Sequence, residues 1–228
     1  MAGKAKIYAV LTGDLIRSSK LSVEQSRKAI ELLKRRAGEF EKTFQGAIQG
    51  ELDSFRHDSW QLLMKRPALA IRATIFLRAS VKMESDATTR YDTRIAIGIG
   101  AVDSISRRRI SDSRGAAFTL SGKALDGMDD ERLAFASENG VAGDCIAQGV
   151  IPLLDCVISD WTATESRAVY GALLGRTQEQ SAAKWRVDQS DTRPSRQAVA
   201  KALRRADWAN LERVLGWIER DAQPQEVA

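Results

Sequence analysis

Apolar and polar positions alternate in two different ways along the chain. Before about residue 150, short apolar runs rich in β-branched residues are separated by longer segments of helical spacing, which predicts alternating strands and helices. After residue 159 only helical spacing remains. The predicted strands cover residues 6–11, 47–56, 59–64, 94–102 and 133–137. The predicted helices cover residues 22–40, 68–83, 116–128, 162–174, 177–187, 195–206 and 208–220.

The order of these elements predicts an α+β fold with two domains. Strand, helix, strand, strand, helix, strand is the βαββαβ order of the ferredoxin-like arrangement, in which helices pack on one face of an antiparallel sheet. A capping box formed by Ser22 and Gln25 marks the start of the first helix. The pattern changes near residues 150–160, so we predict a sheet domain at 1–152 and a helical domain at 158–222.

Composition limits the class of protein without naming its function. The 228 residues are 43% hydrophobic and 29% charged, as in an ordinary globular protein. Cys145 and Cys156 lie in a segment that we expect to be buried, and two cysteines do not suggest a disulfide framework. No signal-peptide pattern and no apolar stretch near about 18 residues is present, so we predict a cytoplasmic protein without a membrane partner. The net charge of +5 is compatible with nucleic-acid or phosphorylated partners, and equally with a solvated basic surface.

Two aspartates are the strongest candidates for chemistry. Asp14 follows the apolar run of the first strand, and Asp58 lies between the second and third strands. Such carboxylates can meet at one edge of a sheet, where one or two carboxylates and phosphate oxygens hold Mg²⁺ against a nucleoside triphosphate. Each aspartate alone has a plainer explanation, because Asp is common in strand-to-loop and hairpin turns. The single histidine, His57, is predicted to be a turn residue.

Five segments of the first domain form a series. They are Ala-Val-Leu-Thr-Gly-Asp-Leu-Ile at 9–16, His-Asp-Ser-Trp at 57–60, Pro-Ala-Leu-Ala at 67–70, Arg-Ile-Ala-Ile-Gly-Ile-Gly at 94–100 and Gly-Ala-Ala-Phe-Thr-Leu-Ser-Gly-Lys at 115–123. In this order they resemble the landmarks of the class III nucleotide cyclase homology domain, and more closely the small bacterial SatD-like proteins. The resemblance implies that Asp14 and Asp58 hold two Mg²⁺ or Mn²⁺ ions. It also implies a purine nucleoside triphosphate as ligand and a site formed between the subunits of a homodimer.

The same resemblance suggests further site residues. Asp112 falls where adenine-reading cyclases keep an aspartate for the purine edge. Thr119 and Lys123 fall near the positions of the family's catalytic Asn and Arg. Thr cannot replace the amide donor well, and Lys lacks the bidentate fork of Arg, so any cyclase activity is predicted to be slow. The candidates to bind the triphosphate, unless they form a solvated basic turn, are Arg107, Arg108 and Arg109.

Two helical patterns of the second domain, at 177–185 and 195–205, are separated by a polar turn. Together they resemble the helix-turn-helix of bacterial regulators, with a turn several residues longer than usual. The residues expected to pack inward from the second helix are Ala198, Val199, Ala202 and Leu203. Arg196 and Gln197 suit base edges. The candidates for phosphate contacts are Arg193, Lys201, Arg204 and Arg205. An amphipathic dimerisation pair would show the same apolar spacing.

These patterns predict a nucleotide-responsive DNA-binding regulator. A Mg-nucleotide site would lie in the first domain, and the second domain would bind double-stranded DNA. The alternative is an enzyme, an active purine nucleotidyl cyclase or nucleotidyltransferase, whose helical domain serves assembly. Release of pyrophosphate from ATP or GTP with Mn²⁺ distinguishes the two.

Overall fold

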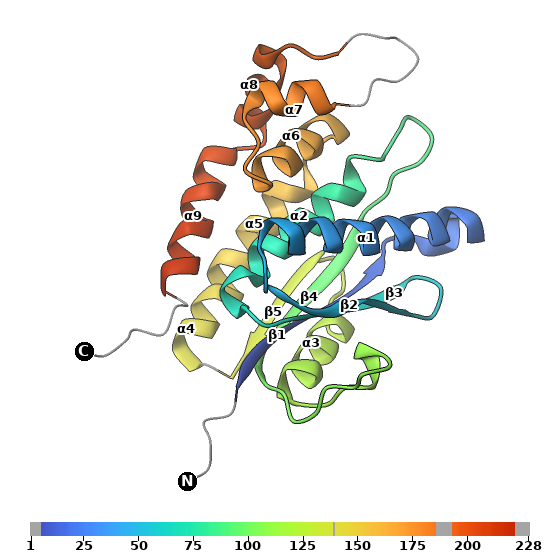
Figure 1. Ribbon diagram of the computed structural model, residues 1–228, viewed down its shortest axis with the longest axis vertical. Helices are drawn as coiled ribbons and strands as arrows, with labels where there is room; N and C mark the ends of the chain where they lie inside the picture. Colours follow the sequence, from blue (N-terminus) through green and yellow to red (C-terminus); the bar gives the residue numbers. More distant parts are fainter. Residues whose placement is uncertain (1–5, 139, 186–192, 222–228) are drawn as a thin grey trace.

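A five-stranded sheet with helices on both faces forms the centre of the molecule (Figure 1). The computed structural model describes residues 6–138, 140–185 and 193–221. The mixed α+β class predicted from the sequence is confirmed. None of the helices in these described ranges is long and apolar enough to cross a membrane.

The sheet has the strand order β2-β3-β1-β4-β5. Its strands are β1 (Ile7–Leu15), β2 (Ile48–Phe55), β3 (Ser59–Met64), β4 (Thr93–Ala101) and β5 (Leu133–Ser137). The first four strands pair antiparallel, whereas β5 runs parallel to β4. β1 lies between β3 and β4, and its residues are buried on both faces because α2 packs on one face of the sheet and α3 on the other.

The first strand is longer than the sequence pattern predicts. We expected it to end at Leu11, but its pairing with β3 and β4 continues as far as Asp14 and Leu15. Gly13 permits this, since a Cβ there would lie 2.5 Å from a ring carbon of Trp60, which crosses the strand. Asp14 is therefore a strand residue and not a turn residue.

Helices α1 (Val23–Thr43) and α2 (Ala70–Lys82) lie on one face of the sheet, and α3 (Ala116–Asp126) lies on the other (Figure 1). The capping box that opens α1 is present as predicted. The expectation that all helices share one face is wrong for α3. The close approach of α3 depends on Gly98 of β4, where a Cβ would overlap the carbonyl oxygen of Ala117.

The rest of the described chain is helical. Its elements are α4 (Gly140–Cys145), the π-helical turn η4 (Ile146–Val150), α5 (Ile151–Ser159), α6 (Ala163–Leu173), α7 (Gln178–Lys184), α8 (Arg196–Arg205) and α9 (Trp208–Asp221). The helical segment from 140 to 159 was not predicted. Cys145 and Cys156 are both exposed in it, so the expectation that they are buried is wrong.

One hydrophobic core connects the sheet with the C-terminal helices. The main cluster contains Leu11 and Ile97 from the sheet together with Ile158, Tyr170 and Leu215 from α5, α6 and α9. The two predicted regions therefore share their apolar interior. The boundary between two domains at residues 150–160 remains a prediction. It can be tested by asking whether the two regions unfold separately in spite of their shared core.

Candidate functional site

Asp14 and Asp58 line the same open cavity, of about 520 Å³, at the end of β1. The pairing of the sheet brings them together, because Asp14 lies opposite Ser59, the residue next to Asp58. The backbone N–H of Leu15 also donates to the carbonyl oxygen of Asp58 at 3.1 Å. Two side chains 44 positions apart in the sequence thus face one solvent-accessible space.

The carboxylate of Asp14 is held by a bidentate ion pair with Arg94. Arg94 Nη2 donates to Oδ2 at 2.6 Å, and Nε donates to Oδ1 at 2.9 Å. The hydrogen bonds to Asp14 raise the pKa of the Arg94 guanidinium. Both oxygens of Asp14 accept from this fork, so its negative charge is largely neutralised and a metal ion would bind it more strongly if Arg94 moved away.

Asp58 is much less neutralised than Asp14. Its Oδ2 accepts a hydrogen bond from the hydroxyl of Ser18 at 2.7 Å, and Oδ1 accepts one from Ser59 at 3.2 Å. No basic side chain in the described part of the chain lies within ion-pair distance of it. Asp58 is half-buried, which leaves a carboxylate at the cavity wall that is stabilised by hydroxyl groups alone.

The connection between α3 and β5 also contributes to the lining of the cavity. Asp129, Asp130 and Arg132 line it, and both aspartates are exposed. Their carboxylates, with those of Asp14 and Asp58, are hard oxygen donors of the kind that Mg²⁺ and Mn²⁺ prefer. Within the described residues, however, no three Asp, Glu, His or Cys side chains are arranged to hold a metal ion. A metal here would depend on further oxygens, such as those of phosphate groups.

The predicted nucleotide-contact residues lie away from this cavity, on the connection between β4 and α3. Arg109 forms an ion pair with Asp53 at 3.4 Å and donates to the carbonyl oxygen of Ser54 at 3.1 Å. Arg107, Arg108 and Asp112 are exposed, and Asp112 ends the short helix η3 (Ile110–Asp112). None of these side chains lines the cavity.

Thr119 and Lys123 also lie outside the cavity. Both are exposed on α3, and the hydroxyl of Thr119 donates weakly to the carbonyl oxygen of Gly115 at 3.4 Å. A single chain therefore does not bring the two suggested catalytic positions into the cavity that contains Asp14 and Asp58.

Three polar side chains that the sequence analysis missed, those of Thr12, Gln61 and Ser121, form a hydrogen-bonded group between the sheet and α3. The hydroxyl groups of Thr12 and Ser121 are 2.8 Å apart, and Gln61 Nε2 donates to Thr12 Oγ1 at 3.1 Å. Thr12 and Asp14 share one face of β1, because side chains alternate along a strand. That alternation was the signal by which Thr12 could have been found.

Helix α8 presents a basic face. The exposed residues that were predicted to contact DNA are Arg193, Arg196, Gln197, Lys201, Arg204 and Arg205. Val199 and Ala202 are buried as predicted, but Ala198 is exposed, so its expected inward packing is wrong. Arg196 forms an ion pair with Glu179 of α7 at 3.3 Å, with both side chains largely exposed.

Helix α8 packs closely against α6 and α7. Val199 and Ala202 share a small core with Ala168 of α6 and Ala182 of α7. Part of the connection between α7 and α8, residues 186–192, lies outside the described residues. The described contacts establish a compact group of three helices, and the helix-turn-helix assignment stays a prediction.

Comparisons with known proteins give low similarities. No protein-family model matches the sequence, and no curated protein matches it. Among solved structures, the guanylyl cyclase Cya2 aligns with a TM-score of 0.43 and 15% identity, covering 60% of this chain and 77% of that chain. A bacterial light-regulated adenylyl cyclase aligns with a TM-score of 0.41 and 18% identity, covering 64% of this chain and 47% of its own. Likenesses at these scores establish neither a family nor a function for this chain.

Proposed function

We propose that this chain binds a purine nucleoside triphosphate together with Mg²⁺ or Mn²⁺ in the cavity of Asp14 and Asp58, and that it acts as a nucleotide-responsive DNA-binding regulator. The observation that carries the proposal is the meeting of these two carboxylates in one open cavity. The strand order β2-β3-β1-β4, with α1 and α2 on one face, supports a ferredoxin-like domain of the cyclase type around the site.

The binding step that fits this geometry is an exchange of ion-pair partners. Asp58 would be the first ligand of a metal ion, because the described residues place uncharged hydroxyl donors on it and no cation. Asp14 would join Asp58 in holding the metal when phosphate groups bound Arg94, whose planar fork suits phosphate as well as carboxylate. A bound metal supplies charge neutralisation between the carboxylates and the phosphates, and Arg94 orients the phosphates.

Calorimetric titration of the full chain with ATP and with GTP, in the presence of Mn²⁺, tests the proposal. Asp58→Asn is expected to weaken metal-dependent nucleotide binding tenfold or more, since interactions with charged groups contribute about 1.5–3 kcal/mol. Asp160→Asn, at an exposed aspartate outside the cavity, is the control and should bind like the wild type. Equal affinities in all three proteins, or no binding by the wild type, would overturn the proposal.

A second candidate function is a slow nucleotidyl cyclase or nucleotidyltransferase formed by a homodimer. The exposure of Thr119 and Lys123 on α3 favours it, because a second copy of the chain could receive these side chains next to its own aspartates. Pyrophosphate release from ATP or GTP that is lost in Lys123→Ala supports the enzyme. Nucleotide binding without pyrophosphate release supports the regulator.

A further inference from the structure

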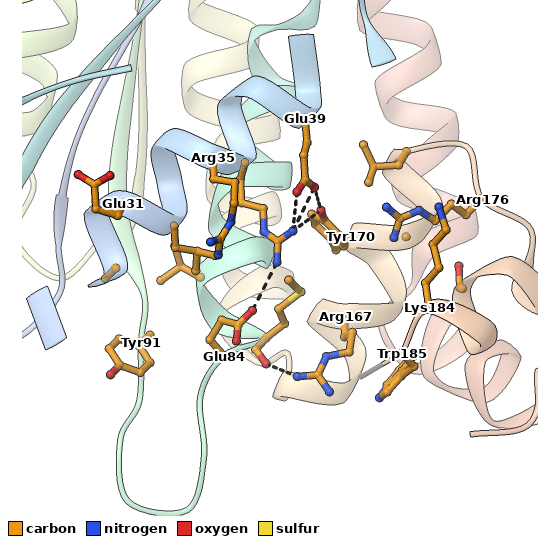
Figure 2. A pocket seen from close by; sticks show the side chains of 18 of the residues that line it. Glu31, Arg35, Glu39, Glu84, Tyr91, Arg167, Tyr170, Arg176, Lys184 and Trp185 are labelled. Carbon is orange, nitrogen blue, oxygen red and sulfur yellow. Dashed lines mark hydrogen bonds and ion pairs between the residues drawn. The ribbon is translucent and has the colours of Figure 1, made fainter. Parts of the chain in front are cut away.

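A second and larger cavity, of about 1310 Å³, separates α1 from the helices α6 and α7 (Figure 2). Its walls come from α1, from the end of α2 and from the segment that runs from α6 to Trp185. None of its lining residues lines the cavity of Asp14 and Asp58. The described lining carries seven Lys or Arg side chains and four carboxylates, so the cavity is positively charged.

One part of the lining is neutralised within the protein. Arg36 Nη1 donates to both carboxylate oxygens of Glu39, at 2.9 and 3.0 Å, and to the hydroxyl of Tyr170 at 2.8 Å. Arg36 Nη2 also lies 3.5 Å from Glu84. Tyr170 in turn donates to Glu39. This network links α1 to α6. Two of the four carboxylates of the lining, Glu39 and Glu84, form ion pairs with the same arginine, Arg36.

Four of the remaining cations have no carboxylate partner among the described residues, whereas Lys28 is paired with Glu24 at 2.7 Å. Arg35 projects from α1, whereas Arg167, Arg176 and Lys184 come from the other wall (Figure 2). Arg35 and Lys184 make no hydrogen bond or ion pair with any described residue. Arg167 donates to the carbonyl oxygen of Met83 at 2.9 Å, and no described carboxylate lies within ion-pair distance of it or of Arg176.

Two of these arginines are oriented by aromatic rings. The guanidinium of Arg176 lies 5.5 Å from the ring centre of Tyr170, and that of Arg167 lies 5.6 Å from the ring centre of Trp185. An arginine held over a ring keeps its N–H groups available at the edge of its plane. Such pre-oriented forks bind phosphate groups well, because little side-chain freedom remains to be lost.

We propose that this cavity binds a small phosphorylated molecule with two or more phosphate groups, between Arg35 on one wall and Arg167, Arg176 and Lys184 on the other. Like charges without counter-ions repel one another, and a polyanion between the walls would replace that repulsion with charge-assisted hydrogen bonds. The cavity volume of about 1310 Å³ lies above the range of about 300–1,000 Å³ that is usual for small-molecule sites, so it has room for a compact ligand together with water. This inference does not rest on the metal-nucleotide site.

Trp185 connects the proposed ligand site with α8. Trp185 packs against the small cluster that contains Val199 and Ala202 of α8, and its ring also lies 5.6 Å from the guanidinium of Arg167 in the cavity. An anion that draws Arg167 and Lys184 toward α1 changes the surroundings of this ring. A change in the fluorescence of Trp185 is therefore expected when the ligand binds.

Calorimetry of the full chain with tripolyphosphate, and separately with ATP, in EDTA tests the proposal. EDTA removes divalent metal, so the cavity of Asp14 and Asp58 does not contribute as proposed. The double variant Arg35→Gln/Lys184→Gln is expected to bind either ligand at least tenfold more weakly, because each substitution removes a charged hydrogen-bond donor to the phosphate groups. Neither side chain bonds to a residue in the described part of the chain, so the variant should fold normally. Arg66→Gln/Arg220→Gln removes the same charge from exposed positions outside both cavities and is the matched control.

The outcomes separate this inference from the proposed function. The site is supported if metal-free binding is weaker in the cavity variant but unchanged in Asp58→Asn and in the control variant. The fluorescence change on binding should also be lost in Trp185→Phe. No binding of tripolyphosphate at millimolar concentration overturns it, as does equal loss in the control variant. Binding of duplex DNA in place of tripolyphosphate, weakened by the same double variant, also overturns it and assigns the cations to nucleic acid.

Discussion

The pair of Asp14 and Arg94 illustrates how a partner is set by strand register. Asp14 was a candidate from the sequence because it ends an apolar run, but Arg94 was read only as the start of a later strand. The two residues lie directly opposite each other in the pairing of β1 with β4. Directly opposed side chains in an antiparallel pair lie close enough to form an ion pair. The sequence thus predicted Asp14 as a site residue but not its ion-pair partner, because the register between two distant strands cannot be inferred from the sequence of either strand.

Replacement of Arg94 by Gln should separate its two proposed roles, which are to neutralise Asp14 in the free protein and to bind phosphate groups in the complex. Without the guanidinium, the carboxylate of Asp14 has no ion-pair partner, so Mn²⁺ alone should bind more tightly than to the wild type. Nucleotide affinity in the presence of Mn²⁺ should fall about tenfold or more, because the phosphates lose a charged donor. Calorimetric titrations with Mn²⁺, and with ATP at saturating Mn²⁺, measure both effects. Unchanged affinities for both ligands would contradict the exchange of partners.

Tyr170 should make the stability of the protein fall steeply at high pH. Burial, together with the hydrogen bond to Glu39, raises the pKa of its phenol from 10.0 to about 12. The stability contributed by the neutral phenol is therefore complete below pH 10 and is lost as the pH rises to 12. A difference of this size corresponds to about 2–3 kcal/mol. Urea unfolding of the wild type and of Tyr170→Phe between pH 9 and 12 measures it. The wild type should lose more stability than the variant, and parallel curves would contradict the assignment.

At the scale of elements, the sequence is most informative where a local signal starts a helix. The pairs Ser22 with Gln25, Thr162 with Glu165 and Thr177 with Gln180 each form a capping box at the start of a helix. Such pairs act within one turn of the chain, so no distant contact is needed to predict them.

The segment from 140 to 159 was missed for the opposite reason. Gly143, Gly149 and Pro152 give it the composition of a loop. Its helical form follows from burial, since Ile151, Leu154 and Ile158 of α5 are in the main core. Pro152 is tolerated because it lies in the first turn of α5, where no intrahelical N–H is required. Tertiary packing decides such a segment, and its periodicity alone does not.

Helix α8 gives a prediction at the same scale. If its basic face binds the backbone of double-stranded DNA, affinity falls steeply with salt. Single replacement of Lys201, Arg204 or Arg205 by Gln should flatten the log–log slope by about one unit and weaken all sequences alike. Arg196→Ala should instead cost about 1–3 kcal/mol on the preferred site only. Fluorescence anisotropy with labelled genomic fragments measures both effects, with Arg220→Gln on α9 as control. Absence of binding at low salt, with or without nucleotide, would favour the dimerisation pair.

At the scale of the whole molecule, a buried arginine joins the sheet to the C-terminal helices. The side chain of Arg78 in α2 is fully buried. Its guanidinium donates to Asp92 before β4 at 2.9 and 3.0 Å, and to Asp155 of α5 at 2.6 Å. Asp155 also accepts from the backbone N–H of Arg132 at 2.7 Å, directly before β5. The two predicted domains are therefore connected by charged groups as well as by the shared core.

Arg78→Ala should destabilise the whole chain and not one region of it. Removal of the guanidinium leaves Asp92 and Asp155 without their buried partner, and the loss of one member of such a pair costs about 3–5 kcal/mol. Arg72→Ala is a milder control, because its ion pair with Glu219 of α9 is partly exposed. Because the core is continuous, hydrogen exchange of β4 amides and of α9 amides should speed up together in Arg78→Ala, within one cooperative unfolding transition. Faster exchange in α9 with unchanged protection in β4 would mean that residues 1–152 fold as a separate domain in spite of the shared core.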